Sequence, residues 1–209
     1  MMIYLADDYI EKYSNVLSYL IGRTIRDKYT TSFIERIISY SACFSEFEKS
    51  NVTIIAFSSS VDIYNDLFPQ FKDNEYTSDP FDEFAWAGQS YIKLFMDLRI
   101  TFESLFLILP IEEMLSLYKI YHEMAYSQLL DYVKSKVKYS YLDLWMKRRK
   151  FSTRRLATET GISLGTINAL RYAKRDISKL EVHKALLIAN KLNIKIESLL
   201  PNIELVFQK

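Results

Sequence analysis

Glycine and proline are scarce in this chain, with 4 of each among 209 residues. A β-sandwich or a β-barrel needs many tight turns, and these two residues supply the backbone conformations that such turns require. Hydrophobic residues make up 49% of the chain, which is ample to bury a core. We therefore predict a mainly α-helical protein. Residues 52–57 are compatible with either one short strand or a buried helical turn.

Apolar residues at helical spacing predict helices through most of the first 138 residues. The sequence Ser78–Pro80 predicts a break in this pattern. The aromatic side chains on these stripes are expected in a core. The four predicted helices follow stripes at Ile10–Ile25, Thr31–Phe44 and Phe84–Leu98, and a long stripe that begins at Pro110 and extends to Tyr132.

Charge divides the sequence into two segments of opposite sign. Residues 139–209 carry 14 lysines and arginines against 6 aspartates and glutamates, a net charge of +8. Residues 1–138 carry 13 against 20, a net charge of −7. Such a split is typical of a basic nucleic-acid-binding domain joined to an acidic domain, although two solvated surfaces would also produce it. We predict a domain boundary between residues 138 and 139, and expect residues 139–209 to fold by themselves.

The sequence favours a cytoplasmic protein without a membrane span. Cys43 has no second cysteine with which to form a disulfide, and no signal segment precedes Asp7. The longest apolar run, Leu105–Leu109, stops at Pro110 and falls far short of the roughly 20 residues that cross a bilayer.

Catalytic and metal-binding patterns are absent from the sequence. The two histidines, His122 and His183, lie in different predicted domains, and no second histidine follows His122 at zinc-protease spacing. Glycine-rich phosphate loops and the Gly-x-Ser-x-Gly nucleophile pattern are also missing. We expect no enzyme activity, no catalytic residue, no metal and no cofactor.

Local helix signals become clear after Ser140. Ser140, Ser152 and Ser163 each precede a helical pattern as an N-cap, and Gly161 is suited to the turn between the second and third helices. Ser178 with Glu181 predicts a capping box for a fourth helix, and a short fifth helix ends before Pro201. The predicted core comprises Leu142, Trp145, Met146, Leu156, Ala157, Ile167, Leu170, Leu180, Ala185, Ile188, Ala189 and Leu192.

This five-helix pattern resembles the helix-turn-helix domain of lambda-type phage repressors and their bacterial relatives, often called the Xre family. The resemblance covers about 60 residues. It rests on Leu156-Ala157, on Gly161-Ile162-Ser163, on Ile167 and Leu170, and on the pattern from Ile188 to Leu200. It implies a lambda-repressor-like domain at 139–209, preceded by a larger and mostly helical domain at 1–138.

The resemblance also implies residues that contact DNA. In the family, the start of the second motif helix faces base edges in the major groove, and flanking residues contact phosphates. The base-facing set carried over to this chain is Ser163, Leu164, Gly165 and Asn168. The phosphate set is Thr153, Thr166, Arg171, Lys174 and Arg175, with Gly161 as the motif turn.

Two departures from the family pattern affect the expected contacts. Leu164 and Gly165 stand where hydrogen-bonding side chains are common, so base discrimination is expected to be weak, to be directed at thymine methyl groups, or to depend on Asn168. Tyr172-Ala173 replaces the frequent Asn-Gly after this helix, so the exact turn and its phosphate contact are not carried over from the family.

These features predict a sequence-specific DNA-binding transcription regulator of the repressor type that binds duplex DNA as a homodimer. Residues 1–138 would then serve in dimerisation or sensing. In the alternative, the protein is of the antitoxin type: residues 1–138 bind a protein partner while residues 139–209 repress the operon. The sequence does not distinguish these roles, and it does not identify the operator or an effector.

Overall fold

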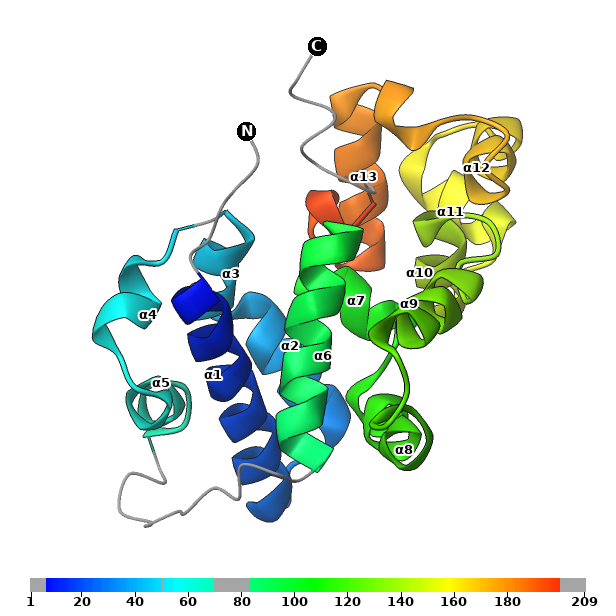
Figure 1. The fold of residues 1–209 in the computed structure, drawn as a ribbon. Helices are drawn as coiled ribbons and strands as arrows, with labels where there is room; N and C mark the ends of the chain where they lie inside the picture. The colour runs from blue at the N-terminus through cyan, green and yellow to red at the C-terminus, as the bar shows by residue number, and fades with distance from the viewer. Residues whose placement is uncertain (1–6, 50, 70–82, 200–209) are drawn as a thin grey trace. The chain divides into compact units, whose positions relative to one another are not determined.

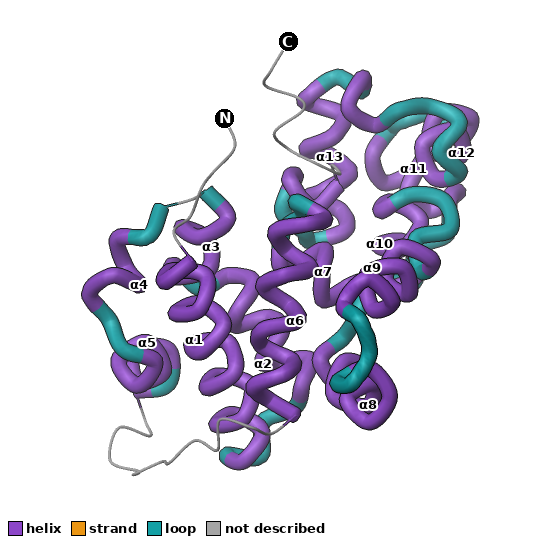
Figure 2. Tube along the Cα trace, viewed as in Figure 1, coloured by secondary structure: helices purple, strands orange, loops and turns teal. Residues whose placement is uncertain are grey.

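The computed structural model describes residues 7–49, 51–69 and 83–199, and all regular structure in these ranges is helical (Figure 2). The predicted mainly α-helical class is confirmed. The segment left open at 52–57 contains a short helix, α4 (Thr53–Phe57), and no strand. The break predicted at Ser78–Pro80 lies outside the described residues.

The chain packs into two compact units that do not divide where the charge changes sign. The N-terminal unit consists of the described residues up to 97 together with 109–129, and the C-terminal unit consists of 98–108 together with the described residues from 130. The predicted boundary at 138/139 therefore does not separate the two units, because a segment from the middle of the sequence belongs with the C-terminal helices.

The N-terminal unit is built around α1, which packs against α2, α4 and α5. One face of α1 is fully buried, with Tyr13, Leu17 and Ile21 each at 0% exposure. The helices assigned wholly or mostly to this unit are α1 (Asp7–Arg26), α2 (Thr31–Tyr40), α3 (Ala42–Glu48), α4, α5 (Ser60–Leu67), α6 (Glu83–Leu98) and α8 (Ile111–Tyr121) (Figure 1).

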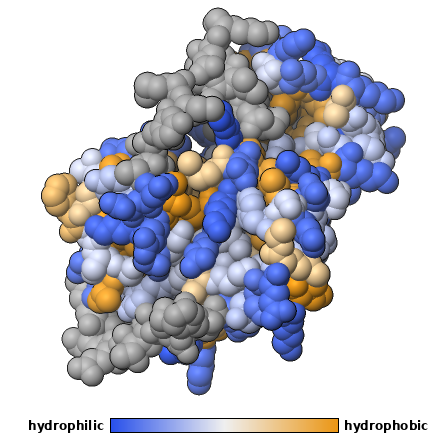
Figure 3. Space-filling view, viewed as in Figure 1, coloured by the Kyte–Doolittle hydropathy of each residue, from blue (hydrophilic) through white to orange (hydrophobic). Residues whose placement is uncertain are grey.

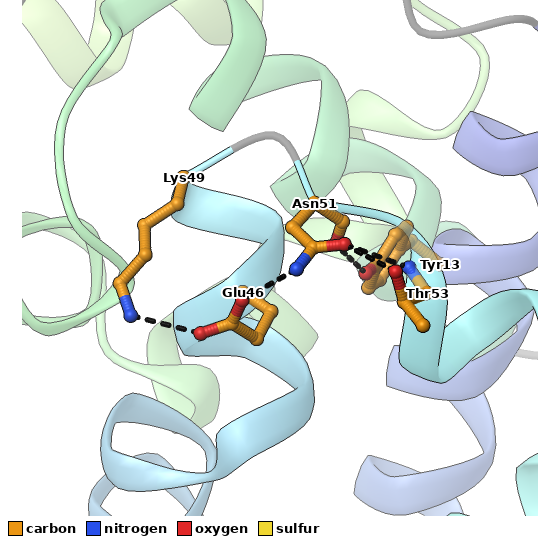
Figure 4. A network of polar contacts seen from close by, with 5 residues as sticks. All are labelled: Tyr13, Glu46, Lys49, Asn51 and Thr53. Atoms are coloured by element: carbon orange, nitrogen blue, oxygen red, sulfur yellow. Dashed lines mark hydrogen bonds and ion pairs between the residues drawn. The ribbon is translucent and has the colours of Figure 1, made fainter.

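Asn51 organises the connection from α3 to α4 (Figure 4). Its amide nitrogen donates to Glu46 at 2.8 Å, and its side-chain oxygen accepts from the backbone N–H of Thr53 at 3.0 Å. The Tyr13 hydroxyl donates to the Asn51 carbonyl at 3.4 Å, which ties the connection to α1. An asparagine that accepts a backbone N–H two residues ahead favours a turn, and here the turn leads into α4 rather than into a strand.

Two long helices expected from the sequence are each interrupted in the structure. The predicted helix Thr31–Phe44 divides into α2 and α3, because Ser41 adopts an extended conformation and its hydroxyl accepts from the Phe44 N–H at 3.3 Å. The predicted continuation from Pro110 to Tyr132 divides into α8 and α9 (Tyr126–Ser135). Residues 122–125 between them are exposed, so no buried contact favours a continuous helix there.

Gly88 brings α6 into close contact with α1. A Cβ atom at this position would lie 2.7 Å from the Ser14 carbonyl oxygen and 2.7 Å from the Ser18 backbone nitrogen. Ser18 also donates a hydrogen bond to the Ala85 carbonyl at 3.4 Å. Any larger residue at 88 would push the two helices apart.

In the described part of the C-terminal unit, the helical elements after residue 138 share one core. They are α10 (Tyr141–Arg148), α11 (Thr153–Thr160), α12 (Leu164–Arg171), α13 (Val182–Leu192) and the 3₁₀ helix η3 (Ile196–Leu199), with a further 3₁₀ turn, η2 (Ile177–Lys179), before α13. The predicted core residues of this unit are buried together, and Ala157 packs half-buried against them. No helix continues across the predicted boundary, since α9 ends at Ser135 and α10 begins at Tyr141.

α7 (Phe102–Ile108), a helix that was not predicted from the sequence, belongs to the C-terminal unit and packs against α10 and η3. Its Glu103 carboxylate is buried and accepts from the Lys195 N–H at 3.1 Å and from the Ser198 hydroxyl. The Ser198 carbonyl accepts from Ser104 at 3.2 Å and from the Trp145 indole at 3.0 Å. α7 thus provides hydrogen-bond partners for the Ser198 hydroxyl and carbonyl and for the Lys195 N–H, which residues 139–209 do not include.

Candidate nucleic-acid interface

α11 and α12 begin and end at the residues that the sequence signals indicate. The Ser152 hydroxyl accepts from the Arg155 N–H at 3.1 Å at the start of α11. Gly161 ends this helix with φ of 69°, in the left-handed region that glycine adopts without steric cost. The Ser163 hydroxyl then accepts from the Thr166 N–H at 3.1 Å and caps α12. The caps predicted at Ser152 and Ser163 are confirmed, and Gly161 has the left-handed backbone expected of a turn glycine.

Buried side chains fix the angle between these two helices. Ile162, in the turn, is 6% exposed and joins the core that contains Leu156 of α11 and Ile167 of α12. The Ile162 N–H donates to the Thr160 hydroxyl at 3.4 Å, and that hydroxyl donates to the Leu156 carbonyl at 2.7 Å. These contacts hold α11 and α12 together and so fix the position of the first turn of α12.

The expected base-facing residues divide by exposure. Ser163, Leu164 and Gly165 are exposed, whereas Asn168 lies half-buried one turn further along. Leu164 retains 45% exposure although it is a large apolar residue. A Cβ atom added at Gly165 would meet no atom within 4 Å. The first turn of α12 thus exposes the apolar Leu164 side chain next to the uncrowded backbone of Gly165.

The expected phosphate-contacting residues differ in their exposure and in their hydrogen bonds within the unit. Lys174 and Arg175 are exposed in the turn after α12. Thr166 is half-buried, and its hydroxyl lies 2.8 Å from that of Ser163. Arg171 donates through Nε to the Asp143 carboxylate at 2.8 Å and through Nη1 to the Thr153 hydroxyl at 3.0 Å. Arg171 and Thr153 are therefore already bonded to each other inside the unit.

Asp143 is the centre of a brace that joins α10, α11 and α12 and that was not predicted from the sequence. The Asp143 residue is 1% exposed, and its carboxylate accepts from Lys147 of its own helix at 2.7 Å and from Arg171 of α12 at 2.8 Å. Burial disfavours the charged carboxylate, but the hydrogen bonds from Lys147 and Arg171 outweigh it and lower the pKa of Asp143. The Ser140 hydroxyl donates to the Arg171 carbonyl at 2.8 Å and adds a second link between α10 and α12.

The turn after α12 keeps the left-handed conformation despite the departure at Tyr172-Ala173. Ala173 has φ of 54°. The Ala173 N–H donates to the Leu170 carbonyl at 3.2 Å, and the Lys174 N–H donates to the Ala169 carbonyl at 2.8 Å. These two bonds form the Schellman motif that usually carries glycine at its left-handed position. Tyr172 packs edge-on against Tyr139, with ring centroids 5.3 Å apart.

The capping box predicted at Ser178 and Glu181 is wrong. Asp176 accepts the Ser178 N–H at 2.9 Å, so Ser178 lies inside η2 and is not an N-cap. Glu181 precedes α13 without a side-chain capping bond, and its carboxylate pairs with Lys184 at 2.5 Å. The aspartate two residues earlier competes for the Ser178 N–H, and the chain then extends through buried Leu180 before α13 begins.

Polar and charged residues dominate the visible surface around α11 and α12, with a smaller hydrophobic area among them (Figure 3). Within the described ranges, no group of three or more histidine, cysteine, aspartate or glutamate residues is arranged to hold a metal ion. No described helix is long and apolar enough to cross a membrane.

Comparisons with protein-family models, with curated proteins and with solved structures found no match to this chain.

Proposed function

We propose that the C-terminal unit binds double-stranded DNA with α12 in the major groove, and that the protein is a sequence-specific transcription regulator of the repressor type. The observation that carries this proposal is the supported pair α11 and α12, joined at Gly161, with the first turn of α12 exposed. A helix presented in this way fits the major groove of B-form DNA.

Charge supports a polyanionic partner. The sequence from residue 139 onward carries a net charge of +8, and the exposed Lys174 and Arg175 lie in the turn after α12. Lysines and arginines that neutralise phosphates release counterions, which makes DNA affinity depend on salt. We assign the phosphate contacts mainly to Lys174 and Arg175, because Arg171 and Thr153 are bonded to each other and to Asp143 within the unit.

The test is duplex binding by the full chain, measured by fluorescence anisotropy over a series of salt concentrations. We expect the double variant Lys174→Ala/Arg175→Ala to bind every duplex more weakly. The slope of log K against log salt should become shallower by about 0.9 for each phosphate that the variant no longer neutralises. The matched control is Lys184→Ala/Lys191→Ala on α13, which removes the same charge from a helix with none of the proposed contacts and should keep the parent slope.

Two results would count against this proposal. Absence of binding to any member of a randomised duplex pool at low salt would reject DNA binding itself. Equal salt slopes for the two double variants and the parent would reject the assignment of Lys174 and Arg175 to phosphates.

We also propose that the protein acts as a homodimer, since one helix-turn-helix unit covers only a half-site. Light scattering of the full chain is expected to give twice the monomer mass of 24.7 kDa. A monomer at micromolar concentration would instead favour the antitoxin-type alternative, in which the acidic N-terminal region binds a protein partner and the C-terminal unit represses the operon.

A further inference from the structure

Leu164 is an apolar residue that the fold of the C-terminal unit does not use. The core of this unit includes Leu156 at 0% and Leu170 at 1% exposure, on either side of Leu164 in the sequence. Leu164 lies outside that core and is 45% exposed at the first position of α12. An isolated exposed leucine is common on protein surfaces, so its neighbours decide whether it has a role.

The fold of the C-terminal unit also does not explain why the next residue, Gly165, is a glycine. Gly88 is required by the close approach of α1, and Gly161 is required by its φ of 69°. Gly165 lies in the first turn of α12, where a Cβ atom would meet nothing within 4 Å. Glycine within a helix costs about 0.5–1 kcal/mol relative to alanine, and one use that compensates for this cost is close approach of the backbone to a ligand.

The chemistry of this pair selects among the groups exposed in the major groove. The Leu164 side chain has no hydrogen-bonding group and Gly165 has no side chain, and the Ser163 hydroxyl before them already accepts the Thr166 N–H. Among the four bases, only thymine presents an apolar group in the major groove, its 5-methyl. The exposed cations Lys174 and Arg175, in the turn after α12, favour nucleic acid over an apolar protein surface as the occupant.

We propose that Leu164 contacts the 5-methyl group of a thymine in the major groove, and that Gly165 leaves room for α12 to approach that base. This inference rests on the proposed DNA binding and names the base class that the same site selects. Preferred duplexes would then contain a thymine at one fixed position in each half-site.

The experiment begins with duplexes selected by the full chain from a randomised pool. Each thymine in the selected site is then replaced by uracil, which removes only the methyl group. At one thymine per half-site we expect parent affinity to fall about fourfold, the effect of exposing one buried methyl group. Leu164→Ala should lose a similar factor on the thymine duplex and should bind the uracil duplex no worse than the thymine duplex. Leu187→Ala, an exposed leucine of α13 at 39% exposure, is the matched control and should behave as the parent.

Gly165→Ala provides a second measurement, whose expected result could not be caused by misfolding. The variant should raise the melting temperature, because alanine stabilises a helix relative to glycine, yet it should weaken binding to the selected duplex at least threefold. A change of stability and affinity in the same direction would overturn the close-approach role of Gly165.

The possible outcomes distinguish failure of the thymine contact from failure of DNA binding itself. A parent chain that binds no duplex rejects DNA binding. A parent chain that selects a site, but is insensitive to uracil at every thymine, overturns the thymine contact and leaves DNA binding in place. Leu164→Ala with reduced affinity but unchanged uracil sensitivity also overturns the contact. So does a Leu164→Ala variant that binds the selected duplex as tightly as the parent.

Discussion

At the residue scale, Ala173 is the least suited residue to its backbone conformation in the turn after α12. Its φ of 54° falls in the left-handed region, which costs a residue with a Cβ atom roughly 1–2 kcal/mol. The Schellman bonds of Ala173 and Lys174 hold the chain there.

We therefore predict that Ala173→Gly stabilises the C-terminal unit by about 0.5–1 kcal/mol, after the greater freedom of glycine in the unfolded chain is subtracted. Differential scanning calorimetry should show a rise in melting temperature of about 2–8 °C. Ala169→Gly, inside α12, is the matched control and should lower stability by about 1 kcal/mol. If both variants lowered the melting temperature, Ala173 would not be strained.

At the scale of helices, the brace at Asp143 fixes α12 to α10 and α11 through Arg171. Because hydrogen bonds lower the pKa of the folded carboxyl despite its burial, ionised Asp143 contributes stability above its unfolded pKa. That contribution is lost as pH falls below about 4, through the folded pKa. The free energy of unfolding of the parent protein should therefore decrease as the pH is lowered within this acid range.

Asp143→Asn should lower the free energy of unfolding at pH 7 by about 1.5–3 kcal/mol, the usual size of a hydrogen bond to a charged group. It should also show less loss of stability than the parent when pH falls below 4. Urea titrations at several pH values measure both effects, and the exposed Asp131→Asn on α9 is the control. Asp176 and Glu181 also have lowered pKa values, so the difference between parent and variant is the relevant quantity. Parallel pH profiles for parent and Asp143→Asn would contradict the brace.

Helices with local signals could be predicted from the sequence, whereas features that depend on distant partners could not. Ser152, Gly161 and Ser163 act within three residues of themselves, and all three have the predicted local structure. The bond from Asp143 to Arg171 joins residues 28 positions apart, and no local pattern indicates it. The prediction at Ser178 failed for a local reason, because Asp176 was a stronger competitor for its N–H.

The contrast between local signals and distant partners also explains why α7 was not predicted. Thr101 carried a usable signal, since its hydroxyl accepts the Ser104 N–H at 3.2 Å as an N-cap does. What the sequence does not indicate is the unit to which this apolar helix belongs. That depends on Glu103 meeting Lys195, 92 residues later. Of the candidate site, the order and caps of α11 and α12 were predictable, but the internal engagement of Arg171 and Thr153 was not.

At the scale of the whole molecule, the chain passes between the two units at 97/98, at 108/109 and at 129/130. The C-terminal unit is therefore not a contiguous piece of sequence, and a cut at the charge boundary would remove α7. Leu107 of α7 packs against the core of that unit, and the backbone and hydroxyl groups of Ser198 bond to residues of α7 and to Thr101 before it.

We predict that a fragment of residues 139–209 is unfolded or much less stable than one of residues 98–209. Each buried polar group left without its partner costs about 1–3 kcal/mol. Loss of Glu103, Thr101 and Ser104 together would remove much of the 5–15 kcal/mol that stabilises a typical domain. Circular dichroism with thermal melting compares the two fragments, and Glu103→Ala in the full chain supplies the test without truncation. That variant should lower the melting temperature of the C-terminal unit, while Glu112→Ala, exposed on α8, should not. Equal helicity and equal melting temperature for both fragments would show that residues 139–209 fold without α7.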